Sequence, residues 1–464
     1  MSTAVESIPE AAAPVGAPTD ISLKTLLTLA WPIILSRSTQ VIIGLTDALM
    51  VAPLGEEALA ATTTGAFDAF SLLILPMGIC FIVSSFSSQL FGAGDKIGAR
   101  RYGFYGLAVA VIAQLICVAL WPASPFLLGL LPYSPHVRDL MAGYLAIRLL
   151  AGGPAIGIEA LSNYYGGLGN TRLPMLINVL AMVLNVLGCW LFIGGHWGAP
   201  ALGVRGSALA AGVATTIAFA IFLTVFLREG QKDGAIFPKL SFAELRRMLR
   251  FGLPSGFNWF FEFFAFFFFI NVVMAGLGTT ALAAMMAVFQ INSVSFMPGF
   301  GLASAGAILV GQAIGAKRLD DVNRAVKLSF LSSASWQLFV SVIYLTLPAV
   351  LLLPFVRNES ESAGFLAAGK RIVMLSAAWQ LFDAAATNLG ETLRAAGDTA
   401  FTLKARTIIA WGVFVPCSYA SVKWFGFGDV GAVFWVAVYL GLLAITLFIR
   451  FRRGAWRDIS LVHD

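Results

Sequence analysis

Apolar segments long enough to cross a membrane recur along the chain from Leu26 almost to its end. Polar connections separate these segments, and about 20 consecutive apolar residues are enough for a helix to span the hydrocarbon core. The longest segments exceed a single crossing, so tilt or extension beyond the bilayer is expected. The pattern predicts twelve spans, at residues 26–50, 59–88, 102–124, 140–165, 173–195, 203–227, 251–275, 281–311, 327–353, 364–394, 400–424 and 430–450.

The two halves of the chain carry the same landmarks in the same order, at a separation of about 222 to 228 positions. The matching landmarks are Pro32 with Pro254, Pro76 with Pro298, residues 89–96 with 312–317, and residues 168–171 with 396–399. With six spans in each copy, both copies keep the same orientation in the membrane. We therefore predict an all-α integral membrane protein in which two six-helix repeats form parallel lobes. A pseudo-two-fold axis relates the lobes around a central cavity, as in transporters built from parallel repeats.

The repeat and the longest polar connection define the expected domain boundaries. These are a disordered cytoplasmic tail at 1–21, an N-terminal lobe at 22–228, a cytoplasmic linker at 229–250, a C-terminal lobe at 251–452 and a cytoplasmic tail at 453–464. The linker is expected to contain a short surface helix at 242–249. Residues 1–19 lack the basic and apolar regions of a cleavable signal peptide.

Composition agrees with a membrane protein and excludes several other classes. Hydrophobic residues make up 59% of the chain and charged residues 12%, against roughly 25% charge in soluble domains. The net charge of +6 is attributed to basic loops on one side, which predicts that both termini are cytoplasmic, and we expect no nucleic-acid partner. The four cysteines lie in apolar segments and the three histidines in loops or the tail, so no disulfide, metal site or cofactor is expected. A P-loop is absent from the sequence, and nothing indicates an enzyme.

Glu262 is the most conspicuous ionisable residue, because it lies within a run of phenylalanines in the seventh predicted span. An ionised carboxylate in hydrocarbon costs several kcal/mol, so intramembrane carboxylates usually serve a function. Burial favours the protonated form, and proton exchange near neutral pH is expected. The alternative is a structural carboxylate that hydrogen-bonds to a neighbouring helix.

Further charges stand in apolar surroundings. Asp383 lies deep in the tenth span, whereas Asp47 lies near the outer end of the first, where a helix-end carboxylate is the alternative. Arg37 either extends its guanidinium to the cytoplasmic surface, pairs with a carboxylate, or attracts an anionic part of a substrate. Asn185 and Asn258 add polar atoms within spans, and such groups often only join helices.

Five stretches resemble the multidrug and toxic compound extrusion (MATE) family, and within it the NorM-like branch. They are Leu29–Ile33, Asp47–Ala52, Gln89–Asp95, Gly203–Ala210 and Leu393–Thr399. The resemblance covers about residues 22–455. It places the family's first-helix aspartate at Asp47, and the branch's seventh-helix glutamate and tenth-helix aspartate at Glu262 and Asp383.

The resemblance implies a secondary antiporter that exports amphiphilic, often cationic, organic compounds in exchange for protons or sodium. It implies a monomer in the bacterial inner membrane, with Asp47, Glu262 and Asp383 as coupling carboxylates. A family pair of polar residues falls on Asn185 and Cys189. A thiol is a poor ligand for sodium, which favours the proton. The residues expected to line the substrate cavity are Arg37, Gln40, Asn185, Asn258, Phe260, Phe263, Phe267, Phe289 and Trp379.

Two alternatives to proton-coupled drug export stay open at this stage. One is sodium coupling. The other is a flippase for lipid-linked saccharides, which needs several cations in its cavity to bind a pyrophosphate, and Arg37 alone offers little support. An ion channel fits poorly, because the duplicated chain has no selectivity-filter stretch.

Overall fold

The computed structural model describes residues 20–129, 134–232, 236–356 and 362–462. In these ranges the chain is helical, without strands. The expected tail at 1–21 therefore lies almost wholly outside the described residues. The long helices are α1 (Leu23–Val51), α2 (Glu56–Gly92), α3 (Lys96–Leu120), α5 (Pro135–Leu150), α6 (Gly152–Gly167), α7 (Arg172–Gly194), α8 (Val204–Lys232), α9 (Phe242–Phe268), α10 (Thr279–Gly315), α11 (Leu319–Thr346), α13 (Ser362–Ala395), α14 (Thr399–Ile409), α15 (Val415–Lys423) and α16 (Gly428–Arg452).

These helices account for the twelve predicted spans. Ten helical segments of the described chain are long and apolar enough to cross a membrane, and α5 and α6 form one further span with a bend of 47°. The bend follows from Ala151, Gly152, Gly153 and Pro154, since glycine and proline interrupt helical hydrogen bonding. The twelfth span is α13, whose 34 residues include the charged side chains of the candidate site.

The main departure from the predicted boundaries concerns the connection between the halves. The expected surface helix at 242–249 forms the first turns of α9, which runs unbroken from Phe242 into the phenylalanine run. α9 then continues as a π-helical turn, Phe269–Met274. A second π-helical turn, Ala410–Phe414, joins α14 to α15. Residues 233–235 of the expected linker lie outside the described part of the chain.

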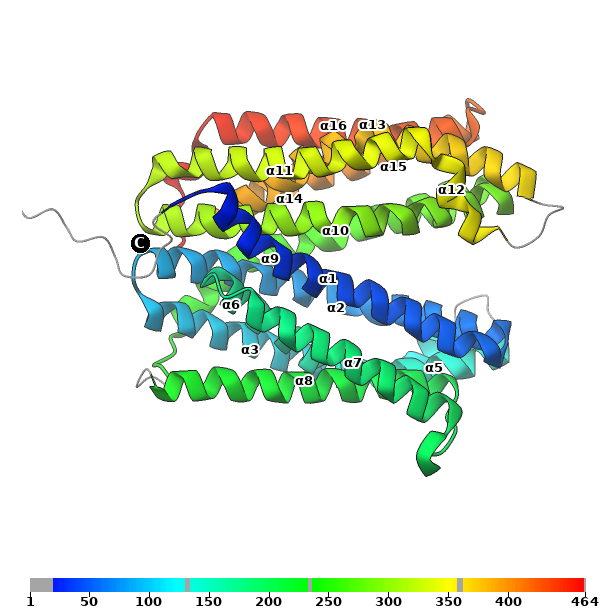
Figure 1. Cartoon of the computed structure of the whole chain (residues 1–464), viewed down its shortest axis with the longest axis horizontal. Helices are drawn as coiled ribbons and strands as arrows, with labels where there is room; N and C mark the ends of the chain where they lie inside the picture. The colour runs from blue at the N-terminus through cyan, green and yellow to red at the C-terminus, as the bar shows by residue number, and fades with distance from the viewer. Residues whose placement is uncertain (1–19, 130–133, 233–235, 357–361, 463–464) are drawn as a thin grey trace, which may run out of the picture.

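The helices form two bundles that correspond to the two repeats (Figure 1). α1 packs against α10, and α9 packs against α2, so the first helix of each repeat contacts the second helix of the other. α2 and α10 are the most buried spans, because each also packs within its own bundle. Gly55 and Gly278 precede these two helices with φ of 111° and 100°. Only glycine adopts such angles without strain, so the repeat extends to the turns.

The bundles close on each other at the end where the carboxyl terminus lies and diverge toward the other end (Figure 1). At the closed end, a side chain at Gly315 would place its Cβ 1.8 Å from the backbone oxygen of Gln89. The repeated glutamines make matching bonds across this contact. Gln89 donates to the carbonyl oxygen of Ala395 at 2.8 Å, and Gln312 donates to that of Gly167 at 3.0 Å. The repeated motifs at the carboxyl ends of α2 and α10 therefore hold the bundles together.

The chain's last described residues reinforce this closed end. Leu461 is fully buried in the core of the N-terminal bundle, and its side chain also contacts Gly397 of the C-terminal bundle. Arg247 donates to the backbone oxygen of Val462 at 3.1 Å. The segment expected to be a tail at 453–464 is therefore packed between the bundles up to Val462.

Candidate functional site

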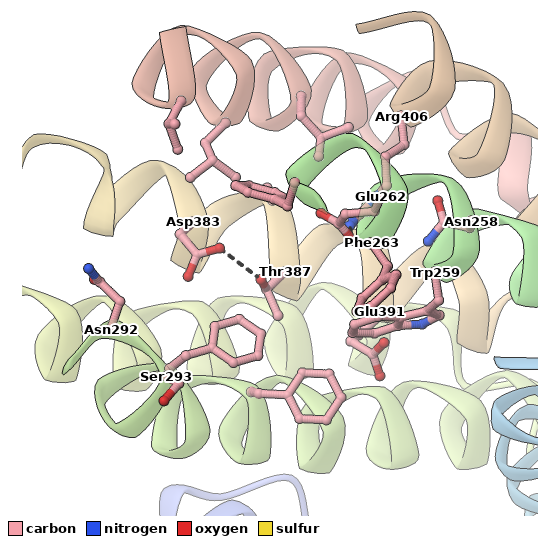
Figure 2. Close-up of a pocket in the computed structure, with 18 of the residues that line it drawn as sticks. Asn258, Trp259, Glu262, Phe263, Asn292, Ser293, Asp383, Thr387, Glu391 and Arg406 are labelled. Atoms are coloured by element: carbon pink, nitrogen blue, oxygen red, sulfur yellow. Dashed lines mark hydrogen bonds and ion pairs between the residues drawn. The ribbon is translucent and has the colours of Figure 1, made fainter. Parts of the chain in front are cut away.

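A cavity of about 460 Å³ lies within the C-terminal bundle. Its wall comes from α9, α10, α13, α14 and α16, and α2 adds Phe70 and Ile74 at one edge. The ionisable residues of the wall are Glu262 on α9, three residues of α13 and Arg406 on α14 (Figure 2). α10 and α16 supply mostly apolar side chains. The cavity is therefore amphiphilic, with charged groups on one part of an apolar wall.

Two donors from neighbouring helices hold the Glu262 carboxylate. Arg406 donates from Nη1 to one carboxylate oxygen, and the Tyr439 hydroxyl donates to the other at 2.9 Å. Tyr439 is fully buried on α16, and its ring stacks on Phe414 with centroids 5.4 Å apart. Both oxygens of Glu262 thus accept a hydrogen bond, and a guanidinium group balances the charge.

Asp383 lies in the same cavity without such a partner. The Thr387 hydroxyl, one turn along α13, lies 3.5 Å from its Oδ1 (Figure 2). Among the described residues no salt bridge reaches Asp383. Nearby, Gln380 donates to Asn292 of α10 at 2.8 Å, which supplies polar surface without charge. Asp383 is consequently the cavity carboxylate that is open to a ligand.

The remaining wall is aromatic. Trp259 meets Phe300 edge-on at 5.9 Å, and Phe263 meets Phe67 of the other bundle at 5.0 Å. Phe289 is 43% exposed, whereas Trp379 is almost buried. Aromatic faces attract cations by their quadrupoles and bind apolar groups by burial.

A second ion pair lies at the border between the bundles. Glu391 lines the cavity and accepts hydrogen bonds from Nε and Nη2 of Arg394, at 3.3 and 2.5 Å. Arg394 also donates to the backbone oxygen of Phe81 on α2, and its own backbone oxygen accepts from Ser85 at 3.0 Å. This pair therefore joins the cavity to the contact between the bundles.

Asp47 lies in the N-terminal bundle, away from this cavity. It is buried on α1, and the Cys189 thiol of α7 donates to its Oδ1 at 3.1 Å. Asn185 is buried one turn before Cys189, and its side-chain amide nitrogen has no hydrogen-bond partner among the described residues. A carboxylate between a thiol and an amide offers few oxygen ligands for a hard cation.

Arg37 does not line the cavity, because a carboxylate of its own bundle binds its guanidinium. Nη1 and Nη2 donate to the two oxygens of Glu159 at 3.1 and 2.7 Å, and Asn163 donates to the same carboxylate at 2.8 Å. The guanidinium also lies 5.5 Å from the ring centre of Phe81 and 5.7 Å from that of Phe300. Of the three alternatives open from sequence, the structure selects pairing with a carboxylate.

We expect Arg37→Gln to destabilise the protein more than the double substitution Arg37→Gln and Glu159→Gln. The single change leaves a buried carboxylate without its cation, which costs about 3 kcal/mol at the lower end for such pairs. Thermal unfolding of the three proteins in detergent measures the difference. A double variant as unstable as the single one contradicts this account.

The structure divides the expected coupling and cavity residues into two groups. The residues that line the cavity are Glu262, Asp383, Asn258, Phe263, Phe289 and Trp379. Those that do not are Asp47, Arg37, Gln40, Asn185, Phe260 and Phe267. The second group points elsewhere for evident reasons. Gln40 is exposed on α1, Phe260 packs on Phe264 at 4.5 Å, and Phe267 stacks on Phe67 at 5.8 Å.

Sequence reasoning missed the groups that neutralise the cavity carboxylates. Arg406 lies only a few positions after the start of the eleventh predicted span, 400–424, so the sequence did not single it out as an intramembrane charge. In the structure it is the eighth residue of α14, which places it two turns inside the bundle. A basic residue that far into an apolar helix is the signal that could have revealed it. Tyr439 and Thr387 are uncharged and give no comparable signal. Glu391 and Arg394 are charges close to the end of the tenth predicted span, 364–394.

Comparison with known proteins gives consistent results. The MatE family model matches residues 32–191 and 254–420, one segment in each repeat. A probable multidrug resistance protein NorM of Pseudomonas putida is 30% identical over 447 residues, covering 94% of each chain. Another of that name, from Agrobacterium fabrum, is 27% identical over 434 residues, covering 92% of this chain and 93% of the relative.

Solved structures share the fold. A crystal structure of MATE in complex with MaL6 superposes with a TM-score of 0.84 at 20% identity, over 94% of this chain and 97% of the other. A transporter of the MOP superfamily from Pyrococcus furiosus gives 0.83 at 19% identity, with the same coverage. These likenesses confirm the predicted twelve-helix architecture. From the family match across both repeats, the chain belongs to the MATE family of membrane transporters and is not an enzyme.

Proposed function

We propose that this protein is an antiporter that exports hydrophobic and amphiphilic organic compounds, many of them cationic, in exchange for protons. It acts by alternating access in the bacterial inner membrane, with both termini in the cytoplasm. The relatives named as multidrug resistance proteins support the export of drugs and toxins. The bundles, closed at one end and diverging at the other, support a cycle in which the cavity opens to each side in turn.

The observation that carries the proposal is the charge of the cavity wall. The wall contains three carboxylates, Glu262, Asp383 and Glu391, and two guanidinium groups, Arg394 and Arg406. With all five ionised, one negative charge is uncompensated, within aromatic walls that suit an organic cation. A cationic substrate and a proton can each neutralise this charge, so binding one promotes release of the other.

The proton is favoured over sodium by the surroundings of the three coupling carboxylates. Both oxygens of Glu262 accept protein hydrogen bonds, and Asp47 lies beside a thiol. Asp383 has polar neighbours, but a proton needs only one carboxylate oxygen, whereas a sodium ion needs several oxygen ligands at once. One proton entering down roughly 100 mV yields about 2.3 kcal/mol. That energy supports on the order of a fifty-fold gradient of a neutral substrate.

A flippase for lipid-linked saccharides finds less support in this cavity. Such a protein needs free cations for a pyrophosphate. Of the lining guanidinium groups, Arg394 is paired with Glu391 and Arg406 with Glu262. Arg37, the third candidate, is paired with Glu159. Among the lining residues that the structure describes, every guanidinium group is therefore already paired with a carboxylate and is not free to bind an anion.

Transport in proteoliposomes tests the proposal. With an imposed pH gradient and no sodium, we expect a fluorescent organic cation to move against its gradient, because protons alone supply the counter-charge. Collapsing the pH gradient with a protonophore should stop this movement. Export that runs only on a sodium gradient, at every pH, overturns the proposal, and vesicles without protein provide the baseline.

A further inference from the structure

Arg406 has a role in this cavity that goes beyond charge balance. We propose that its guanidinium is a tethered counter-cation that keeps Glu262 ionised throughout transport, so that Asp383 alone carries the exchangeable proton of the C-terminal bundle. The inference rests on the proposed proton exchange and divides the roles of its two cavity carboxylates.

The first step of the argument is the chemistry of Arg406. A guanidinium group does not lose its proton at accessible pH, so Arg406 cannot be the group that exchanges one. It is little exposed, at 14% of its side chain, and its partner Glu262 is 17% exposed. In such surroundings the ion pair keeps Glu262 ionised, because protonating Glu262 would leave the guanidinium of Arg406 buried and unpaired.

The second step concerns Tyr439. Its hydroxyl donates to the other oxygen of Glu262, and burial of Tyr439 between Phe266 and Phe414 fixes that geometry. With both oxygens accepting, a proton on Glu262 would weaken two hydrogen bonds that the ionised form makes. Protonation would also leave the guanidinium of Arg406 without its counter-charge. Glu262 is thus committed to partners within the protein.

The third step is the contrast with Asp383. The charged or titratable groups near it are Glu262 from α9, Arg406 from α14 and Tyr439 from α16. α10 has no charged residue, and the charges of α11 lie in its first turns. Because Glu262 already engages the nearest cation, Asp383 is left with the Thr387 hydroxyl (Figure 2). Its carboxylate holds a proton when the cavity is empty and releases it when a cation arrives.

The arrangement predicts a count of protons. The Glu262–Arg406 and Glu391–Arg394 pairs are each neutral, so one exchangeable charge remains per cavity. Purified protein in weakly buffered detergent, titrated with tetraphenylphosphonium, should release about one proton per cation bound at a pH where Asp383 is protonated. A pH-sensitive dye measures the release and equilibrium dialysis measures the binding.

The deciding variant is the double substitution Glu262→Gln and Arg406→Gln, which removes the pair together. Removing both partners of a buried pair is tolerated far better than removing one. Because both residues line the cavity, we expect this variant to bind tetraphenylphosphonium more weakly. It should still release about one proton for each cation that it binds. Arg406→Lys retains the positive charge and should also release about one proton per cation bound. It replaces the double variant in this experiment if the double variant does not fold.

Two results overturn the inference. One is loss of proton release in the double variant while cation binding persists, which makes Glu262 the proton carrier. The other is continued release of about one proton in Asp383→Asn. Failure of the proposed function looks different, because then the unmodified protein itself binds the cation without releasing a proton.

Discussion

Asp383→Asn is expected to reduce pH-driven export to the level of vesicles without protein. The substitution keeps the shape of the side chain and its ability to accept from Thr387, but it removes the uncompensated charge of the cavity. Without that charge, an organic cation and a proton no longer compete for one position. The bilayer-facing surface is unchanged, so insertion and folding should survive.

The pH dependence of cation binding gives a second, more specific readout. When one proton competes with one cation, affinity rises with pH by about tenfold per unit while the group is protonated, and levels off above that range. The sign follows because the empty cavity binds the proton and the loaded cavity does not. In Asp383→Asn this slope should vanish, leaving weak binding at every pH.

Asp320→Asn is the matched control, since Asp320 is an exposed aspartate at the start of α11. It should retain both export and the slope. Wild-type export by Asp383→Asn would contradict the assignment and move the coupling site to Asp47 in the other bundle. Asp47→Asn would then be the variant that loses the slope.

The sequence predicted the candidate carboxylates of the cavity because their signal is local. Glu262 and Asp383 each interrupt a long apolar segment, and a charge in such a segment needs an explanation. The repeat was equally readable, since prolines and glutamines recur at a constant separation. The number of helices and the division into two bundles follow from these patterns.

The partners of these carboxylates depend on helix rotation and depth, which a single sequence does not specify. Whether Arg37 binds a substrate or pairs with Glu159 depends on how α1 and α6 are rotated toward each other within the N-terminal bundle. Likewise, Arg406 pairs with Glu262 only because α14 packs beside α9 and the two residues lie at the same depth in the bundle. The phenylalanine run concealed a further feature, because eight phenylalanines between residues 260 and 269 show no periodicity that separates cavity-facing Phe263 from Phe260 or Phe267.

Replacing Arg394 by glutamine is expected to cause the largest loss of stability of any single change at the cavity border. Arg394 is 9% exposed and neutralises Glu391, and it also donates to the backbone oxygen of Phe81 across the contact between the bundles. Its removal leaves Glu391 as an unpaired carboxylate at a largely buried position, which costs on the order of 3–5 kcal/mol.

The double substitution Arg394→Gln and Glu391→Gln separates the two contributions of Arg394. If charge neutralisation dominates, the double variant should recover most of the lost stability, because two neutral amides can hydrogen-bond to each other. If the bond to Phe81 dominates, the double variant should remain as unstable as Arg394→Gln. We expect recovery, because an unpaired buried charge costs more than one lost neutral hydrogen bond. A double-mutant cycle measures this by thermal unfolding of the unmodified protein, both single variants and the double variant. If Arg394→Gln unfolds at the same temperature as the unmodified protein, the pair has no stabilising role.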